Sequence, residues 1–334
     1  MENGLKVSVV IVCYNESKNI EQCINSILSQ SYPHELFEVV IVDNNSMDGT
    51  IDKIKKYKDS ADNLELYINP VKSISKSRNM GLTRSKHGLV AFTDADCIVP
   101  ADWLETLVHG YSENKKLEPF LVAAGGSNIP PQEASGFYDA LKIMVNTFLG
   151  SGGSVQGMVL KEDRYVSHIP TVNVLYEKEV VVKEGGFDEK MGSIEEDEDL
   201  SWRLAKKGYK FLYLKDSFVL HKMRGDILGW AKNMFTYGKG KIWLFKKHPD
   251  KFNVFLTFPM LLAALILSAA ILRSGLLSLI LLFYVILIFL VSSFECHKAE
   301  KLHLTFRVFL LYLTTHIAYG IGEWYGLALP IGKG

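Results

Sequence analysis

Residues 7–12 read V-S-V-V-I-V, and residues 89–93 read L-V-A-F-T. Both stretches are almost entirely apolar, and the first is rich in β-branched residues, a pattern typical of strands buried on both faces of a parallel sheet. Apolar residues at helical spacing follow the first stretch between positions 20 and 28, with Asn15 or Ser17 as the expected cap. The chain therefore opens with a strand followed by a helix.

The same alternation continues along the first half of the chain. Further strands are predicted at 37–42, 64–68 and 89–93, with helices up to residue 57 and over 74–86 between them. Strands that alternate with helices predict an α/β fold with a mostly parallel sheet and right-handed crossovers. After residue 120 strands and helices no longer alternate regularly, so we expect an α+β region with strands at 120–124 and 211–220 and a helix near 177–184.

The C-terminal part is far more apolar than the rest. Residues 254–272 and 274–294 contain no charged residue, and only Arg273 lies between them. At about 1.5 Å per helical residue, each stretch is long enough to cross a hydrocarbon core of roughly 30 Å. Two membrane spans are therefore predicted here.

A third span is predicted over 304–329, although this stretch contains Arg307, His316 and Glu323. We expect Arg307 to reach the interface from one end of the helix and Glu323 to reach it from the other.

Acidic and basic residues are concentrated in different parts of the chain. Residues 188–199 are mostly acidic, whereas residues 222–251 are rich in Lys, Arg and aromatic residues. The basic stretch resembles a helix that lies on anionic lipid headgroups, and the alternative is an amphipathic helix packed on the protein. We thus predict a first domain at 1–221, a basic interfacial segment at 222–252 and a membrane domain at 253–334.

Composition narrows the classes of protein further. The 334 residues include 37 Lys and Arg against 37 Asp and Glu, with 48% hydrophobic residues, which excludes a disordered or collagen-like chain. No signal peptide is expected, because the first apolar stretch is short and lacks a cleavage site.

The sequence has four cysteines: Cys13, Cys23, Cys97 and Cys296. They form no C-x-x-C pair, so we expect reduced, mostly buried thiols. We expect no nucleic-acid partner.

Residues 93–96 read T-D-A-D and follow a predicted buried strand. Ligands of parallel sheets bind at the carboxyl ends of the strands. Carboxylates at Asp94 and Asp96 suit a hard divalent cation that bridges to phosphates, although an isolated D-x-D triplet is usually only a solvated turn. His221, at the end of another predicted strand, is placed to be a metal ligand, with a structural role as the alternative.

Five consecutive acidic residues, at 195–199, precede an amphipathic helix. Some of them are expected to complement the helix dipole. Five exceed what capping needs, and like charges held close raise one another's pKa, which tunes a general base toward neutral pH.

An ordered set of motifs carries a family resemblance. The set comprises V-V-I-V-C-Y-N-E (9–16), V-V-I-V-D-N-N-S-M-D-G-T (39–50), S-R-N-M-G (77–81), T-D-A-D (93–96), G-G-F-D-E (185–189) and E-D-E-D-L-S-W-R-L (196–204). Over residues 7 to about 222, the chain resembles the family 2 glycosyltransferases of GT-A fold, and its layout is similar to that of the bacterial and archaeal members that build cell-surface glycans on lipid carriers.

The resemblance implies roles for individual residues. A nucleotide-sugar donor, with a UDP-sugar as the first candidate, would be held by five residues: Tyr14, Glu16, Asp43, Arg78 and Asp94. Asp96, with His221 as in some relatives, would bind a Mn²⁺ or Mg²⁺ ion under the diphosphate. Asp197 would be the base that deprotonates the acceptor. No Q-x-x-R-W follows the acidic motif, which argues against a processive polysaccharide synthase.

The expected activity is inverting, metal-dependent transfer of a sugar to a lipid-linked acceptor at the membrane. Direct transfer to polyprenyl phosphate and a catalytically silent membrane scaffold are the alternatives; a transporter is disfavoured because the spans contain few ionisable groups. Under the positive-inside rule, Lys298 and Lys301 place the 295–303 loop and the catalytic domain in the cytoplasm and the C-terminus outside. We therefore expect a multi-pass protein of the cell membrane.

Overall fold

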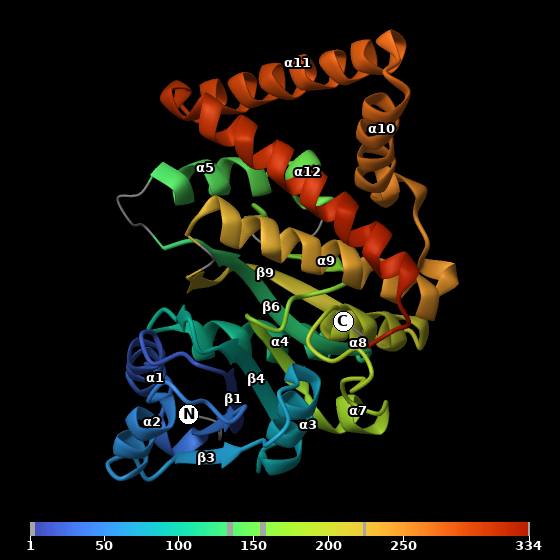
Figure 1. Ribbon diagram of the computed structural model, residues 1–334. Helices are drawn as coiled ribbons and strands as arrows, with labels where there is room; N and C mark the ends of the chain where they lie inside the picture. Colours follow the sequence, from blue (N-terminus) through green and yellow to red (C-terminus); the bar gives the residue numbers. More distant parts are fainter. Residues whose placement is uncertain (1–3, 132–135, 154–157, 223–224, 333–334) are drawn as a thin grey trace. The chain divides into compact units, whose positions relative to one another are not determined.

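The computed structural model describes residues 4–131, 136–153, 158–222 and 225–332. It divides into two compact units (Figure 1). The first comprises Met1–Ile129 and Val159–Lys222, and the second comprises Pro130–Met158 and Met223–Gly334. The segment from Pro130 to Met158, predicted as part of the first domain, thus belongs with the C-terminal helices.

The first unit is built on a nine-stranded sheet in the order β3-β2-β1-β4-β8-β6-β9-β5, with β7 paired to β9. The strands are β1 (Val7–Cys13), β2 (Phe37–Asp43), β3 (Leu64–Ile68), β4 (Leu89–Asp94), β5 (Cys97–Ile98), β6 (Leu121–Ile129), β7 (Arg164–Val166), β8 (Val174–Glu177) and β9 (Lys210–His221). Pairing is parallel from β3 through β4, as the alternating pattern predicted. Beyond β4 the sheet is mixed, because β8 runs antiparallel to both β4 and β6.

Both faces of the sheet are covered by helices, which explains the uninterrupted apolar strands. The helices of this unit are α1 (Ile20–Leu28), α2 (Thr50–Lys58), α3 (Ile74–Arg84), α4 (Trp103–Leu117), α7 (Lys178–Lys183) and α8 (Glu196–Lys206). On β1, Val9 and Ile11 pack into one hydrophobic core with residues of α1 and α4. Val10 packs into the opposite core with residues of α3, α7 and α8.

One detail of the first helix differs from the prediction. The N-cap of α1 is Asn19, and its side chain makes no capping hydrogen bond. Asn15 instead has a φ of 54°, and its Oδ1 accepts a hydrogen bond from the Met47 amide, while the Ser17 amide donates to Asp48. Both predicted caps therefore stabilise the neighbouring loop after β2.

The second unit is helical. Its helices are α5 (Gly136–Val145), α6 (Phe148–Ser151), α9 (Ile227–Lys247), α10 (Phe258–Leu272), α11 (Gly275–Lys298) and α12 (Thr305–Ala328). Among the residues that the structure describes, three segments are long and apolar enough to cross a membrane: Val254–Leu272, Gly275–Lys298 and Leu302–Ala328. They match the predicted spans closely. The sequence from 150 to 157 is rich in Gly and Ser; it begins within α6, and residues 154–157 lie outside the described part of the chain.

Helices α9 and α12 lie side by side (Figure 1) and approach each other closely at glycines. A Cβ atom on Gly322 would lie 2.1 Å from the backbone oxygen of Phe235, and one on Gly238 would lie 2.1 Å from that of Tyr319. Small residues allow helix backbones to pack this closely in membrane proteins. Trp230 and Trp243 of the basic segment are buried, so part of its aromatic face packs on protein, as in the alternative interpretation.

The prediction for Glu323 is wrong. We expected its carboxylate to reach the membrane interface, but the residue is 0% exposed. Its position on the face of α12 that carries Gly322 and Gly326 explains this, because that face packs against α9. A buried carboxylate in an apolar helix is costly, and in the described part of the chain neither oxygen of Glu323 has a hydrogen-bond partner.

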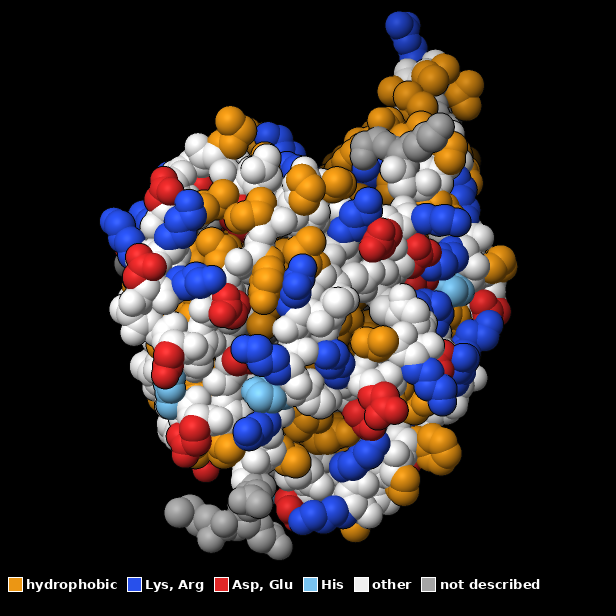
Figure 2. Space-filling view, turned by 90° about the horizontal axis from the view of Figure 1, so that it is seen from below, with side chains coloured by type: hydrophobic (Ala, Val, Ile, Leu, Met, Phe, Trp, Pro, Cys, Tyr) orange, Lys and Arg blue, Asp and Glu red, His pale blue; other side chains and the backbone are white. Residues whose placement is uncertain are grey.

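Charges of both signs are interspersed over the face of the molecule shown in Figure 2. This distribution agrees with the equal numbers of acidic and basic residues, 37 of each. The four cysteines are free and buried, as expected.

Adding a methyl group at the α9–α12 contact should destabilise the second unit. We expect Gly322→Ala to lower the midpoint of thermal unfolding in detergent, since overpacking typically costs about 1–3 kcal/mol. Gly275→Ala is the control, because a Cβ atom there would meet no atom within 4 Å. Equal midpoints for the two variants would contradict the close contact.

Candidate active site

Three parallel strands bring the candidate residues to one edge of the sheet. The register pairs Cys13 with Asp43 and Val12 with Asp94, so β1, β2 and β4 end side by side. Their carboxyl ends lead into the loops that carry the predicted donor-binding residues. Ligand sites of parallel sheets form at such edges.

The backbone around this edge adopts unusual conformations. Asn15, Asn45 and Glu195 have φ values of 54°, 61° and 57°. Non-glycine residues rarely occupy this left-handed region, and such residues cluster at functional sites. Asn15 follows β1, Asn45 follows β2, and Glu195 precedes α8, so all three flank the predicted site.

The donor-binding candidates after β1 and β2 differ in accessibility. Asp43 is fully buried, and its carboxylate accepts hydrogen bonds from the Ser46 amide and hydroxyl, both at 2.6 Å. Tyr14 is 37% exposed, and the Lys72 ammonium lies 3.9 Å from the centre of its ring. The Asp43 carboxylate therefore stabilises its own loop through Ser46, whereas the Tyr14 ring is accessible to a ligand.

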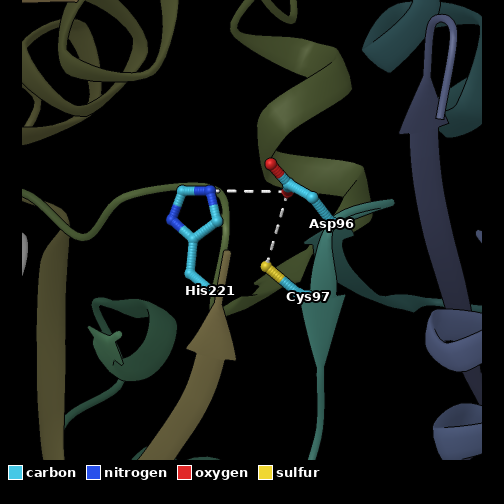
Figure 3. A group of neighbouring side chains, drawn as sticks. All are labelled: Asp96, Cys97 and His221. Atoms are coloured by element: carbon cyan, nitrogen blue, oxygen red, sulfur yellow. Dashed lines mark hydrogen bonds and ion pairs between the residues drawn. The ribbon is translucent and has the colours of Figure 1, made fainter. Parts of the chain in front are cut away.

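Asp96, Cys97 and His221 form a group that could hold a metal ion (Figure 3). The short strand β5 pairs with the end of β9, which sets Cys97 opposite His221. As a result, Asp96 Oδ1 lies 3.4 Å from His221 Nε2. The other ring nitrogen of His221 lies 3.2 Å from the Asn128 side-chain amide, which orients the ring.

The donor set at Asp96 and His221 fits a divalent cation. Ligand atoms about 2.1 Å from an ion, at adjacent corners of an octahedron, lie about 3 Å apart, close to the separation of Oδ1 and Nε2. A carboxylate suits Mn²⁺ and Mg²⁺, and an imidazole favours the softer of the two. Burial, reinforced by the charges of Asp96 and Asp94, raises the pKa of the Cys97 thiol and favours its protonated form, and both of these hard ions prefer oxygen ligands to sulfur.

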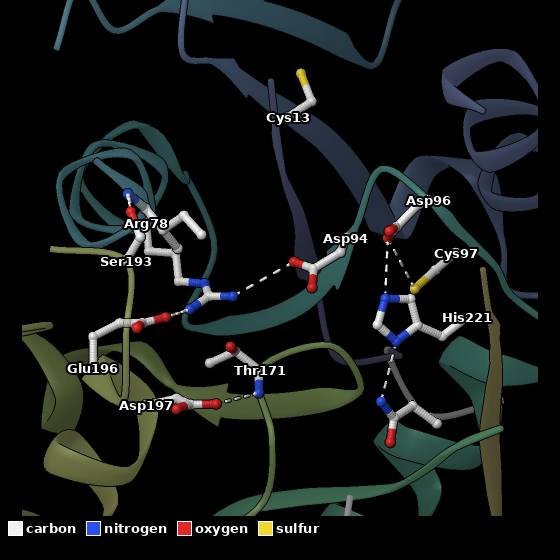
Figure 4. Close-up of polar contacts among 12 residues, drawn as sticks. Cys13, Arg78, Asp94, Asp96, Cys97, Thr171, Ser193, Glu196, Asp197 and His221 are labelled. Atoms are coloured by element: carbon white, nitrogen blue, oxygen red, sulfur yellow. Dashed lines mark hydrogen bonds and ion pairs between the residues drawn. The ribbon is translucent and has the colours of Figure 1, made fainter. Parts of the chain in front are cut away.

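In Figure 4 the Arg78 side chain points toward both Asp94 and Glu196. Its guanidinium donates to the Glu196 carboxylate and lies 3.5 Å from Asp94 Oδ1. Both Arg78 and Glu196 are buried. Burial raises the pKa of the Asp94 carboxyl, although the positive charge of Arg78 opposes that shift. The helix α3, the strand β4 and the N-terminus of α8 are thereby joined through one cation.

Asp197 lies beside this pair in the first turn of α8. Its Oδ2 is 3.5 Å from His168 Nε2 and 3.4 Å from the Thr171 amide nitrogen. Burial alone would raise the pKa of Asp197, but the proximity of the His168 imidazole, with the charge of Arg78, holds it well below its usual range. Burial instead raises the pKa of Glu196. The upward shift expected for the base therefore falls on Glu196 and not on Asp197.

The remaining charges of the acidic run are partly structural. Asp199 is fully buried and accepts a hydrogen bond of 2.9 Å from Arg203 Nε. Arg203 also donates to the backbone oxygens of Glu184 and Gly186, in the loop after α7. Asp199 therefore anchors α8 to this loop, whereas Glu196 and Asp197 face the site.

Two contacts at the site could not be predicted from the sequence. His168 lies in a stretch without periodicity, so no signal marked it as a partner of Asp197. The pairing of Arg78 with Glu196 joins two motifs that are 118 residues apart. The predicted residues Arg78, Asp94 and Asp197 do come together, and Asp96 and His221 form their own pair along the same edge.

Known proteins share this architecture and sequence. Residues 8–132 match the family model described as glycosyl transferase family 2, and residues 89–296 match the model of glycosyl transferase family group 2. Glycosyltransferase AglE of Haloferax volcanii is 31% identical over 268 residues, covering 78% of this chain and 80% of the relative. A dolichyl N-acetyl-α-D-glucosaminyl phosphate 3-β-D-2,3-diacetamido-2,3-dideoxy-β-D-glucuronosyltransferase of Methanococcus voltae is 26% identical over 269 residues, covering 78% of this chain and 81% of the relative.

The fold is also similar to that of a solved structure. The mannosyltransferase PcManGT from Pyrobaculum calidifontis, in complex with GDP-Man and Mn²⁺, has a TM-score of 0.60 at 18% identity, covering 94% of this chain and 88% of that one. At this identity the likeness concerns the fold, whereas the family models and the Haloferax relative concern the sequence. The chain therefore belongs to the family 2 glycosyltransferases, enzymes of GT-A fold that depend on a nucleotide-sugar donor.

Proposed function

We propose that this enzyme transfers a sugar, with inversion, from a nucleotide-diphosphate sugar to a lipid-linked acceptor at the cytoplasmic face of the cell membrane. The reaction would depend on Mn²⁺ or Mg²⁺. Asp197 would act as the base, and Tyr14, Glu16, Asp43, Arg78 and Asp94 would hold the donor. We assign the metal to Asp96 and His221.

One observation carries the proposal. The carboxylates at the sheet edge form two groups on separate elements, since Asp96 pairs with His221 across β5 and β9 and Asp197 lies on α8. An inverting transfer needs both a site for the leaving diphosphate and a base on the opposite side of the sugar. Arg78 contacts both Asp94 and Glu196 at the same edge, and a cation there can neutralise developing negative charge.

The proposed step moves one proton and exchanges one bond. Asp197 takes the proton of the acceptor hydroxyl, and the resulting oxygen forms a bond to the anomeric carbon. The bond from that carbon to the diphosphate oxygen breaks, and its electron pair leaves with the nucleotide. Asp96 and His221 would hold the cation, which would supply charge neutralisation for the diphosphate. The low pKa of Asp197 keeps it ionised, and therefore able to accept a proton, throughout the neutral range.

A membrane acceptor is supported by the second unit and by the relatives. Three helices are long and apolar enough to cross a membrane, and a basic segment precedes them. The Methanococcus relative is named for transfer onto a dolichyl-phosphate-linked sugar. The solved neighbour contains GDP-Man, so a donor screen should include guanine as well as uracil nucleotides.

Metal binding should depend on Asp96 and, to a smaller extent, on His221. We expect Asp96→Ala to abolish Mn²⁺ binding measured by electron paramagnetic resonance, and His221→Ala to weaken it, since one carboxylate ligand remains. Cys97→Ser is the matched control and should bind Mn²⁺ like the unmodified protein, because the thiol is protonated. A loss of binding in Cys97→Ser alone would contradict this assignment.

The base assignment predicts a loss of rate without a loss of donor affinity. Asp197→Asn preserves the shape of the side chain but cannot accept a proton, so kcat should fall by roughly 100- to 10,000-fold. Donor affinity, measured by calorimetry, should change little.

Glu196→Gln serves as the comparison for that variant. It removes the negative partner of the buried Arg78, so it should lower thermal stability and alter donor affinity as well as rate. A selective loss of kcat in Glu196→Gln, with Asp197→Asn still active, would move the base to Glu196.

The topology can be tested by labelling single cysteines with a membrane-impermeant reagent. Cysteine at Lys298 should be protected in intact cells, and cysteine at Gly334 should be labelled, because the Lys and Arg residues favour the cytoplasmic side. Labelling of Lys298 from outside would reverse the orientation. Labelling of both positions from the same side would eliminate the third span.

A further inference from the structure

His168 lies between β7 and β8, and its side chain is 15% exposed. Its Nε2 atom is buried. Within the described part of the chain, the polar atom that faces this nitrogen is Asp197 Oδ2, at 3.5 Å. The separation is long for a hydrogen bond, and contacts of this kind shorten when a substrate closes the site. A buried imidazole nitrogen is thus directed at the proposed base.

A second donor from the same loop acts on the same oxygen. The Thr171 amide lies 3.4 Å from Asp197 Oδ2, three residues after His168. The other oxygen, Oδ1, accepts a hydrogen bond of 2.8 Å from the Glu198 amide at the start of α8. The loop before β8 therefore holds one edge of the carboxylate, and the helix holds the other.

We propose that His168 is a positioning residue for the transfer reaction, whose Nε2–H donates to Asp197 Oδ2 and keeps the carboxylate ionised and oriented toward the acceptor hydroxyl. This inference rests on the proposed role of Asp197 as the base. His168 itself contacts neither donor nor acceptor in this assignment.

The charges around Asp197 explain why such a partner is needed. Arg78 on α3 favours the ionised carboxylate, but Glu198 on its own helix opposes it. Three further titratable groups interact with Asp197: Asp94 on β4, Tyr176 on β8 and Glu196 on α8. Burial also disfavours the charged form. His168 and Arg78 together offset these unfavourable effects on the ionised carboxylate. Arg78, however, is already shared between Glu196 and Asp94.

The sign of the resulting pH effect is fixed. A base with a depressed pKa remains active at lower pH, and loses activity as the pH falls through that pKa. Removing His168 raises the pKa of Asp197, so the acid limb of the kcat/KM profile for the acceptor moves to higher pH. A residue that only fills space would change stability and leave this limb in place.

The test compares His168→Ala and His168→Gln in the full-length protein, with purified nucleotide sugar and acceptor. His168→Ala should lower kcat/KM for the acceptor by roughly 10- to 100-fold at neutral pH, as expected for a lost hydrogen bond to a charged group, and should move the acid limb of the profile to higher pH. His168→Gln retains an N–H donor at a similar distance along the side chain, so it should recover most of the loss. KM for the donor should be unchanged in both.

His34→Gln is the matched control, since His34 also lies near an aspartate, with its Nδ1 3.9 Å from Asp62 Oδ1, but that pair is exposed. The pH profile of His34→Gln should equal that of the unmodified enzyme.

An acid limb that stays in place in His168→Ala would overturn the inference, as would equal losses of kcat/KM in His168→Ala and His168→Gln. Asp197→Asn, measured alongside, separates the role of Asp197 from that of His168. If Asp197→Asn stays active, the base assignment fails. If Asp197→Asn is inactive but the His168 variants show an unshifted acid limb, only the role of His168 is refuted.

Discussion

The Arg78 guanidinium is buried between the carboxylates of Glu196 and Asp94, and the candidate active site depends on this arrangement. Removing one partner of a buried ion pair typically costs about 3–5 kcal/mol, because the other charge is left uncompensated. Arg78 belongs to α3, Asp94 ends β4 and Glu196 begins α8. The pairing therefore fixes the N-terminus of α8, and with it Asp197, against the edge of the parallel sheet.

Much of the first unit could be predicted, for a physical reason. Strands such as β1 and β2 are buried on both faces, so they are apolar throughout and stand out from the amphipathic helices between them. Parallel strands place their carboxyl ends together, so Asp43 and Asp94, which end β2 and β4, lie at the same edge of the sheet. The mixed half of the sheet was less predictable, since β8 pairs with strands that are distant in sequence.

Contacts between side chains could not be predicted in the same way. His168 carries no periodic signal, and its proximity to Asp197 arises from the loop before β8. The burial of Glu323 depends on the glycines Gly238 and Gly322, whose role appears only when α9 and α12 are packed together. Net charge in the acidic run suggested a raised pKa for the base, whereas burial raises the pKa of Glu196, and at Asp197 the effect of burial is outweighed by His168 and Arg78, which lower the pKa.

The stereochemistry of the product tests the central claim most directly. The purified enzyme would be incubated with a panel of nucleotide sugars, Mn²⁺ and a lipid-linked acceptor, and the anomeric configuration of the product would be determined from its proton coupling constants by nuclear magnetic resonance. A direct displacement assisted by one base predicts inversion, so an α-linked donor should give a β-linked product. Retention of the donor configuration would contradict this account of the site.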